Sequence, residues 1–171
     1  MESAKKLLES LWVYGVAAAV DVPPTVEDTR RAVEAVAPIM HTTFGDIAAF
    51  EANLERADTA YTSEYIGLHT DNTYWTQPAG YNAYDRAEMS TIETDKVYEV
   101  YSAYQKLGRA ITEPSREFQI KLQPGTTLFI DNFRVLHARK AFDGRRVMIF
   151  AYVLRDEFLS RLKVAGVFSG L

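Results

Sequence analysis

The sequence contains no cysteine. This absence excludes disulfides, thiolate metal sites and cysteine nucleophiles together. Long apolar runs are missing too, since the longest, residues 11–20, is too short to span a bilayer and contains Gly15. Positive charge is not in excess, with 19 Lys+Arg against 23 Asp+Glu and a net charge of −4. We therefore expect binding neither to nucleic acid nor to an anionic membrane through bulk electrostatics.

Targeting and linker signals are also absent from the sequence. The opening MESAKKLLESLW mixes both charge signs at helical spacing, whereas a transit peptide is rich in Arg and poor in acids. We expect a soluble chain without a transit signal. Its 171 residues can bury a real core, and no repeat or Gly/Ser-rich linker divides them. A single domain over residues 1–171 is therefore predicted.

Helical patterns occupy much of the first two thirds of the chain. Thr25 with Asp28 three residues later is typical of a capped helix start. Tyr98, Tyr101 and Tyr104 fall on one helical face, which favours helix core over a substrate cage. Residues 41–80 look loop-like with short extended pieces. The predicted elements are helices at 3–11, 25–38 and 97–111 and a strand at 16–20.

The last third changes to a β pattern. Residues 117–122 alternate polar and apolar side chains, as in a half-buried strand, and Pro124-Gly125 predicts a turn before a strand at 126–130. Residues 147–154 are continuously apolar, as in a strand buried on both faces. Asp156 can cap a final helix that ends near Gly166. These elements predict an α+β fold with a sandwich or small barrel as its core.

One group of polar residues forms a candidate metal site. His69-Thr70-Asp71 is a His-x-Asp, and on a strand its imidazole and carboxylate would share a face. His137, after the strand at 126–130, is a candidate third ligand. Two histidines and one carboxylate form the facial triad of non-haem Fe(II) sites. The alternative is chance, because His-x-Asp is a common tripeptide and a lone histidine is more often a surface or core residue.

Arg146 adds weight to this hypothesis. By strand periodicity it shares a face with Met148, Phe150 and Tyr152. A guanidinium that faces an apolar interior needs an anionic partner, and a carboxylate suits its planar fork best. A dicarboxylate such as 2-oxoglutarate would meet both the metal and the arginine. The alternative is a salt bridge from Arg146 to an internal acid, Asp131 or Asp143.

Three runs of sequence resemble a known family. They are DTAYTSEYIGLHTDNTYW at 58–75, YNAYDRAEM at 81–89 and LQPGTTLFIDNFRVLHARKAF at 122–142. All three resemble the gamma-butyrobetaine and trimethyllysine dioxygenases, which are Fe(II)- and 2-oxoglutarate-dependent hydroxylases of carnitine biosynthesis. The second and third runs point more to the trimethyllysine enzymes. The resemblance extends from Leu11 to the C-terminus.

The resemblance implies a double-stranded β-helix (jelly roll) core with flanking helices. It implies hydroxylation of N6-trimethyl-lysine at C3, or of a related small cationic substrate, with ascorbate as a candidate reductant. It also makes a homo-oligomer and either the cytoplasm or the mitochondrial matrix candidates for assembly and location. The implied site residues are His69, Asp71 and His137 for iron, Arg146 for the distal carboxylate of 2-oxoglutarate, and Tyr61, Phe44 and Asn82 for the substrate.

The sequence also departs from the family. Ala48 stands where the family usually carries a tryptophan, which should weaken a cation–π cage. The family's N-terminal zinc-binding domain has no counterpart, and an internal family segment is absent between Gly80 and Tyr81, so the stretch from His69 to His137 is short. We therefore expect a jelly roll that lacks several strands. The alternative function is a non-catalytic remnant or isoform that binds metal or ligand weakly or pairs with a full-length subunit.

Other polar residues have simpler interpretations. His41 is expected to be solvated or locally hydrogen-bonded. Asp131 and Asn132 either support the metal ligands from the outer shell or form a turn. Arg139-Lys140 and Arg145 are expected to belong to a solvated basic surface.

Overall fold

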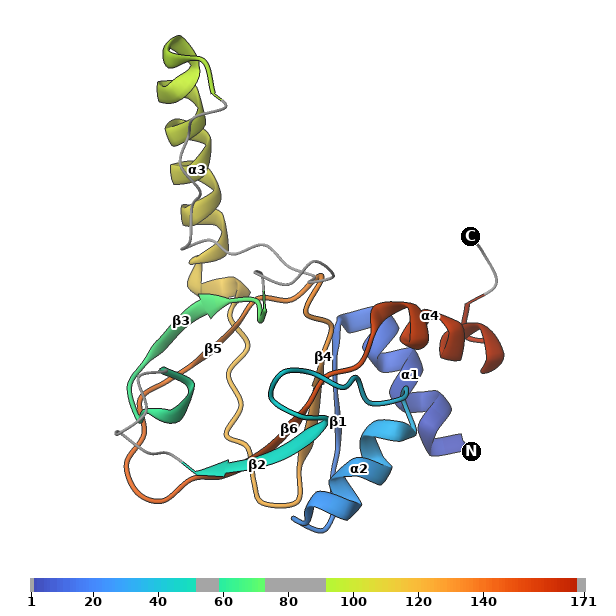
Figure 1. Cartoon of the computed structure of the whole chain (residues 1–171). Helices are drawn as coiled ribbons and strands as arrows, with labels where there is room; N and C mark the ends of the chain where they lie inside the picture. Colours follow the sequence, from blue (N-terminus) through green and yellow to red (C-terminus); the bar gives the residue numbers. More distant parts are fainter. Residues whose placement is uncertain (1, 52–58, 73–91, 169–171) are drawn as a thin grey trace.

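The computed structural model describes residues 2–51, 59–72 and 92–168 (Figure 1). Short 3₁₀ turns lie at 59–61, 94–96 and 114–116. Asn82 and the junction between residues 80 and 81 lie outside the described residues. The helices and strands are α1 (Glu2–Tyr14), β1 (Val16–Ala19), α2 (Val26–Glu34), β2 (Ile47–Glu51), β3 (Ile66–His69), α3 (Val97–Ile111), β4 (Thr127–Ile130), β5 (His137–Arg139), β6 (Val147–Ala151) and α4 (Arg155–Val164).

The strands join as three antiparallel pairs, β1 with β4, β2 with β6, and β3 with β5. Val16 lies opposite Ile130 in the first pair, and Ile47 lies opposite Ala151 in the second. The predicted α+β class is therefore confirmed. Within the described ranges these pairs do not join into a larger sheet, and no closed jelly roll forms.

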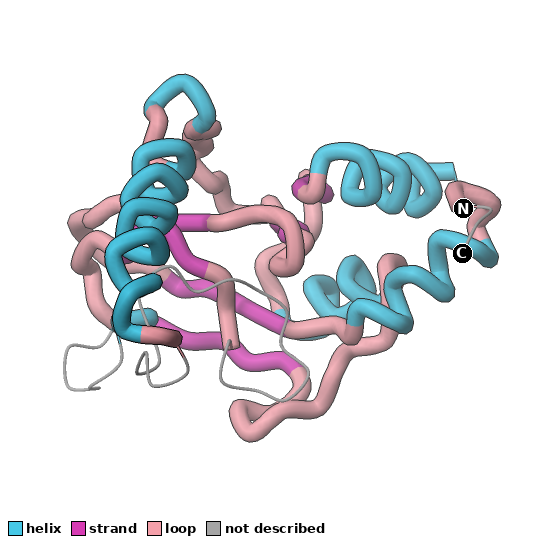
Figure 2. The backbone as a smooth tube through the Cα atoms, turned by 90° about the horizontal axis from the view of Figure 1, so that it is seen from above, coloured by secondary structure: helices cyan, strands magenta, loops and turns pink. Residues whose placement is uncertain are grey.

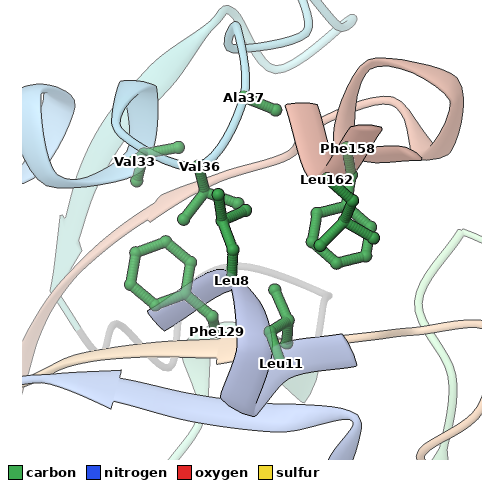
Figure 3. Packing of buried hydrophobic residues seen from close by; sticks show 8 residues of the cluster. All are labelled: Leu8, Leu11, Val33, Val36, Ala37, Phe129, Phe158 and Leu162. Atoms are coloured by element: carbon green, nitrogen blue, oxygen red, sulfur yellow. The ribbon is translucent and has the colours of Figure 1, made fainter. Parts of the chain in front are cut away.

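The hydrophobic core lies between the helices near the two ends of the chain and β4. Leu8 from α1, Val36 after α2 and Leu162 from α4 are at most 2% exposed. Phe129 brings β4 into the same cluster, as Figure 3 shows. Viewed from above, α3 stands on the opposite side of the strands from these helices (Figure 2). The core therefore fixes β1, β4 and β6 but does not include α3.

Local sequence signals set several boundaries as expected. The side chain of Thr25 caps α2 by accepting a hydrogen bond from the backbone N–H of Asp28 at 3.0 Å. The helix predicted at 3–11 continues to Tyr14 and stops at Gly15, whose φ of +74° favours glycine. A Cβ at Gly15 would lie 2.5 Å from Cγ2 of Val135, so this position also allows the close approach of the β4–β5 connection.

Two predicted strands differ in the structure. Residues 117–122 are not a strand, and Phe118 is 83% exposed, because no neighbouring strand pairs with them in the described structure. The apolar run 147–154 forms β6 only as far as Ala151, and it is not buried on both faces, since Val147 is 50% exposed. In the described structure β6 also has a single hydrogen-bonded neighbour, β2, so one of its edges is unpaired.

Two predicted helix features are also corrected. Leu154, not Asp156, is the N-cap of α4, and it makes no side-chain capping bond; Asp156 lies in the first turn. The tyrosines of α3 are not helix core, because α3 has no buried residue and projects away from the strands (Figure 1). Tyr98 is 83% exposed and Tyr101 43% exposed. The helix at 97–111 was predicted correctly, but the burial of its tyrosine face was not.

Candidate metal centre

The two histidines of the candidate site form a cross-strand pair. His69 ends β3 and His137 begins β5, and the two residues are register partners. Their ring centroids are 4.3 Å apart. Asp71 lies in the bend just after β3 rather than on the strand, which corrects the expected strand geometry of His-x-Asp. The bend nevertheless brings its carboxylate to both imidazoles.

The three side chains converge on one point. Oδ1 of Asp71 lies 3.5 Å from Nε2 of His69 and 3.6 Å from Nε2 of His137. One ligand atom from each residue can be chosen so that all lie within 4.8 Å of one another. Nδ1 of His69 lies 2.8 Å from the carbonyl oxygen of Gly67, to which it donates as N–H. That bond leaves Nε2 as the ring nitrogen that faces Asp71 and can bind a metal ion.

Burial and the histidines act in opposite directions on the Asp71 carboxyl. Desolvation alone would raise its pKa, but contacts with His137 and His69 outweigh this and hold the pKa of Asp71 far below its ordinary value. The Asp71 carboxylate in turn raises the pKa of His69, against the lowering effect of burial. The site therefore holds a carboxylate anion at neutral pH, ready to bind a cation.

Asn132 fixes the position of Asp71. Its Oδ1 accepts a hydrogen bond from the backbone N–H of Asp71 at 2.8 Å, and its Nδ2 donates to the carbonyl of Asp71 at 2.9 Å. Sequence analysis left Asn132 open between an outer-shell role and a turn, and these two bonds favour the outer shell. They tie the bend after β3 to the connection between β4 and β5.

The neighbouring Asp131 anchors this connection to the core helices. Its side chain is 4% exposed and accepts from Nε of Arg134 at 2.7 Å and Nη1 of Arg155 at 3.0 Å. Arg134 also donates to the carbonyls of Leu11 and Trp12 at the end of α1. The backbone of the site is thereby joined to α1 and α4.

We expect Asn132→Ala to weaken metal binding about 10- to 100-fold, as loss of an outer-shell partner typically does. The reason is that the Asp71 backbone loses both hydrogen bonds. Titration calorimetry with Mn²⁺ measures the change, and Gln105→Ala on exposed α3 is the matched amide truncation. Equal affinity in the two variants would show that Asn132 does not position Asp71.

Arg146 lies beside a second guanidinium. Both Arg146 and Arg139 stack on the ring of Phe142, each 5.3 Å from its centroid. Burial and the charge of Arg139 lower the pKa of Arg146. In the described structure no carboxylate lies within 4.0 Å of Arg146, and Asp131 pairs with Arg134 and Arg155 instead. The salt-bridge alternative to Asp131 or Asp143 is therefore absent from the described residues.

Arg139 does not belong to a solvated basic surface. Its Nη1 donates to the carbonyl of Ala60 at 2.9 Å and its Nη2 to the carbonyl of Glu64 at 2.8 Å. The register places Arg139 opposite Ile66 at the start of β3, so it holds the segment before the site against β5. Arg145 and Lys140 are exposed as expected, and His41 is exposed too.

The predicted substrate residues are distributed unevenly. Tyr61 lies at one end of a row of four aromatic rings. Its ring centroid is 5.2 Å from that of Phe50, and the ring of Phe50 is 5.5 Å from that of Phe150. The ring of Phe150 in turn contacts that of Tyr152. The hydroxyl of Tyr152 lies 3.4 Å from Oδ2 of Asp71. The sequence did not predict this contact, because strand periodicity indicated only that Tyr152 shares a face with Arg146. Ala48 lies opposite Phe150.

Phe44 lies apart from this row. It occupies the turn at 42–45, where it is 47% exposed. No ring contact in the described part of the chain joins it to the triad. Its predicted role in substrate binding stays a prediction, as does that of Asn82, which is outside the described residues.

The donor set fits a divalent metal of the iron type. Two imidazoles and one carboxylate on one side of a point leave coordination positions open on the other. Nδ1 of His137 is buried and has no hydrogen-bond partner among the described residues. Within that part of the chain the ring is not committed to another bond and can take the tautomer that metal binding requires. The triad is the one group of its kind found among the described residues.

Comparison with known proteins decides the relationship. The family model "Taurine catabolism dioxygenase TauD, TfdA family" matches residues 81–152. The human protein "Trimethyllysine dioxygenase, mitochondrial" is 28% identical, and its bovine counterpart 27% identical, over 97% of this chain and 58% of theirs. The chain is a relative of the TauD, TfdA dioxygenases. "Gamma-butyrobetaine dioxygenase" of Pseudomonas sp. is 40% identical over 43% of this chain and 20% of its own.

The similarity to these relatives covers only part of their length. The chain spans less than two thirds of the human and bovine relatives. The alignment with the human protein extends over 245 residues, more than the 171 of this chain, so part of the relative has no counterpart here. The chain is shorter than its relatives, as the resemblance in sequence implied. None of the described helices has the length and apolar character needed to cross a bilayer.

Proposed function

We propose that this chain is an Fe(II)- and 2-oxoglutarate-dependent hydroxylase that acts on N6-trimethyl-lysine at C3 or on a related small cationic substrate. The observation that carries the proposal is the convergence of His69, Asp71 and His137 on one point. The names of the relatives support the substrate class. The fold would be a jelly roll that lacks several strands.

Each residue has a stated task in this proposal. His69, Asp71 and His137 would hold Fe(II), and Arg146 would bind the distal carboxylate of 2-oxoglutarate with its planar fork. Burial makes an isolated charge on Arg146 costly, and an anion relieves that cost. When bound, the metal and cosubstrate supply the oxidative chemistry that inserts oxygen into a C–H bond. Tyr61 would place the quaternary ammonium by a cation–π contact.

Succinate formation tests the activity. We expect it to require Fe(II), 2-oxoglutarate and trimethyl-lysine together, with ascorbate as reductant. A folded, iron-loaded sample that forms no succinate with this substrate or with gamma-butyrobetaine would refute the proposal.

Replacing Arg146 is expected to abolish the effect of 2-oxoglutarate on the melting temperature but not the effect of Mn²⁺. Mn²⁺ should still raise the melting temperature of Arg146→Ala, whereas the further rise with 2-oxoglutarate should disappear, because the distal carboxylate has lost its partner. Arg145→Ala is the matched control, since its neighbouring guanidinium pairs with Glu51 on the surface. Differential scanning fluorimetry with each ligand gives the result. An unchanged 2-oxoglutarate shift in Arg146→Ala would contradict the assignment.

A second function is favoured by the strand pairs. Three separate two-stranded sheets in the described structure leave the site without a closed barrel around it. A remnant or isoform would bind metal or ligand weakly, or pair with a full-length subunit, without turnover. A melting temperature raised by Mn²⁺ together with no succinate under any condition would favour this alternative. For location we propose the mitochondrial matrix, with the cytoplasm as the alternative, because the human and bovine relatives are named as mitochondrial proteins.

A further inference from the structure

One side chain of β5 holds the backbone on both sides of Tyr61. Nη1 of Arg139 donates to the carbonyl of Ala60 at 2.9 Å, and this carbonyl belongs to the peptide unit that leads into Tyr61. Nη2 donates to the carbonyl of Glu64 at 2.8 Å and lies 3.5 Å from Oγ1 of Thr62. The guanidinium therefore contacts the chain immediately before and immediately after Tyr61.

Phe142 adds a second attachment to the same segment. Its backbone N–H donates to the carbonyl of Ser63 at 3.1 Å. The guanidinium of Arg139 lies over its ring, 5.3 Å from the centroid. This stacking supports the guanidinium in the plane from which its two terminal nitrogens reach separate carbonyls. Arg139 and Phe142 together tie residues 60–64 to β5 and to the connection that follows it.

The strand that carries Arg139 also carries a metal ligand. His137 and Arg139 are both half-buried, whereas Ala138 between them is exposed, so the two side chains lie on one side of β5. His137 pairs with His69 and Arg139 with Ile66, and the register shifts between these pairs because β3 advances three residues while β5 advances two. Bulges of this kind redirect side chains beside active sites. One short strand thus positions both the metal ligand and the backbone around Tyr61 (Figure 1).

The ring of Tyr61 has a fixed relation to the metal centre. It packs edge-on against Phe50, with the ring planes at 72°, at one end of the aromatic row that ends at Tyr152 beside Asp71. A cation–π contact requires the cation within about 6 Å of the ring centroid. Binding groups work only when other residues hold them close to the productive geometry. The backbone contacts of Arg139 supply such support for Tyr61.

We propose that Arg139 is a positioning residue for substrate binding. By fixing the backbone around Tyr61, it sets where the quaternary ammonium of the substrate lies relative to the metal held by His137. This inference rests on the proposed function, because it assigns Tyr61 to the substrate. Arg139 itself contacts neither the substrate nor the metal. Its replacement therefore weakens substrate binding and leaves metal binding unchanged.

Arg139→Lys tests this role because lysine keeps the positive charge but loses the planar fork that joins two carbonyls. We expect the dissociation constant of trimethyl-lysine from protein loaded with Mn²⁺ and 2-oxoglutarate to rise about 5- to 30-fold, as loss of a desolvated cation–π contact produces. The dissociation constant of Mn²⁺ should stay within about twofold of the wild-type value. Titration calorimetry gives both constants. Arg145→Lys is the matched control, since Arg145 pairs with Glu51 on the surface.

A double-mutant cycle separates positioning of Tyr61 from general loosening of the fold. If Arg139 acts through Tyr61, adding Arg139→Lys to Tyr61→Ala should weaken trimethyl-lysine binding no further. Additive losses in the double variant would overturn the proposal. So would an unchanged constant for trimethyl-lysine in Arg139→Lys, or an equal loss of Mn²⁺ affinity.

Hydrogen exchange of the backbone amides at 60–64 gives a readout that needs no substrate. Exchange should be faster in Arg139→Lys than in the wild type and in Arg145→Lys, because the segment has lost its attachment to β5. Unchanged exchange would show that Arg139 does not hold this segment. A wild type that binds neither trimethyl-lysine nor gamma-butyrobetaine would instead refute the proposed substrate class, and with it the substrate role of Arg139, even where exchange responds as expected.

Discussion

Asp71→Ala is expected to lower the affinity for Mn²⁺ by more than about 100-fold, beyond the roughly 10- to 100-fold typical of an outer-shell loss. The carboxylate is the one anion among the three ligands, and Oδ1 lies 3.5 Å from His69 and 3.6 Å from His137. Without it, two neutral imidazoles remain and the site loses its negative charge. His137→Ala should have a comparable effect because it removes the cross-strand ligand.

The measurement is the metal-dependent rise in melting temperature. A ligand at about 100 times its dissociation constant adds roughly 2.7 kcal/mol to the free energy of unfolding, and this gain should vanish in Asp71→Ala. His41→Ala serves as the control, since His41 is exposed and far from the triad in sequence. Metal-free melts of each variant report folding separately. A wild-type Mn²⁺ shift in Asp71→Ala would rule out this carboxylate as a ligand.

Leu162→Ala is expected to lower the free energy of unfolding by about 2–5 kcal/mol. The side chain is 0% exposed and belongs to the cluster that joins α4 with α1 and β4 (Figure 3). Truncation loses apolar burial and leaves a cavity that packed neighbours fill only in part. Since domains are typically stable by only about 5–15 kcal/mol, this single change removes a large share of the total.

Urea denaturation followed by circular dichroism measures this difference. Val164→Ala on the same helix is the control, because Val164 is 80% exposed; its effect should stay within about 0.5 kcal/mol. Equal losses in the two variants would mean that the packing of α4 against the core does not hold the chain together.

Helix boundaries and the polar site were predictable to different degrees. The cap at Thr25 and the period of α3 depend on neighbouring residues, so sequence analysis located both helices. The convergence of His69 and His137 depends on the β3–β5 register. The pattern of two histidines and one carboxylate suggested this convergence, but the spacing of the residues alone could not distinguish a metal site from chance. Asn132 was noticed in sequence, yet only its two bonds to Asp71 separate a positioning residue from a turn.

What failed was the prediction of burial. The alternation at 117–122 and the apolar run at 147–154 both describe which face of a strand is apolar, and neither specifies whether another element covers it. Coverage is non-local: it depends on which strands the rest of the chain supplies, and in the described structure β6 has one neighbour and 117–122 has none.

The sequence by itself therefore determined the α+β class, the helix positions and the absence of thiol chemistry. These follow from residue type and local spacing, which act over a few neighbouring residues. The tertiary structure decided that the imidazoles meet the Asp71 carboxylate, that Asp131 pairs with Arg134 and Arg155, and that α3 stands outside the core. Each of these is a contact between segments far apart in the chain, and only their packing in three dimensions sets it.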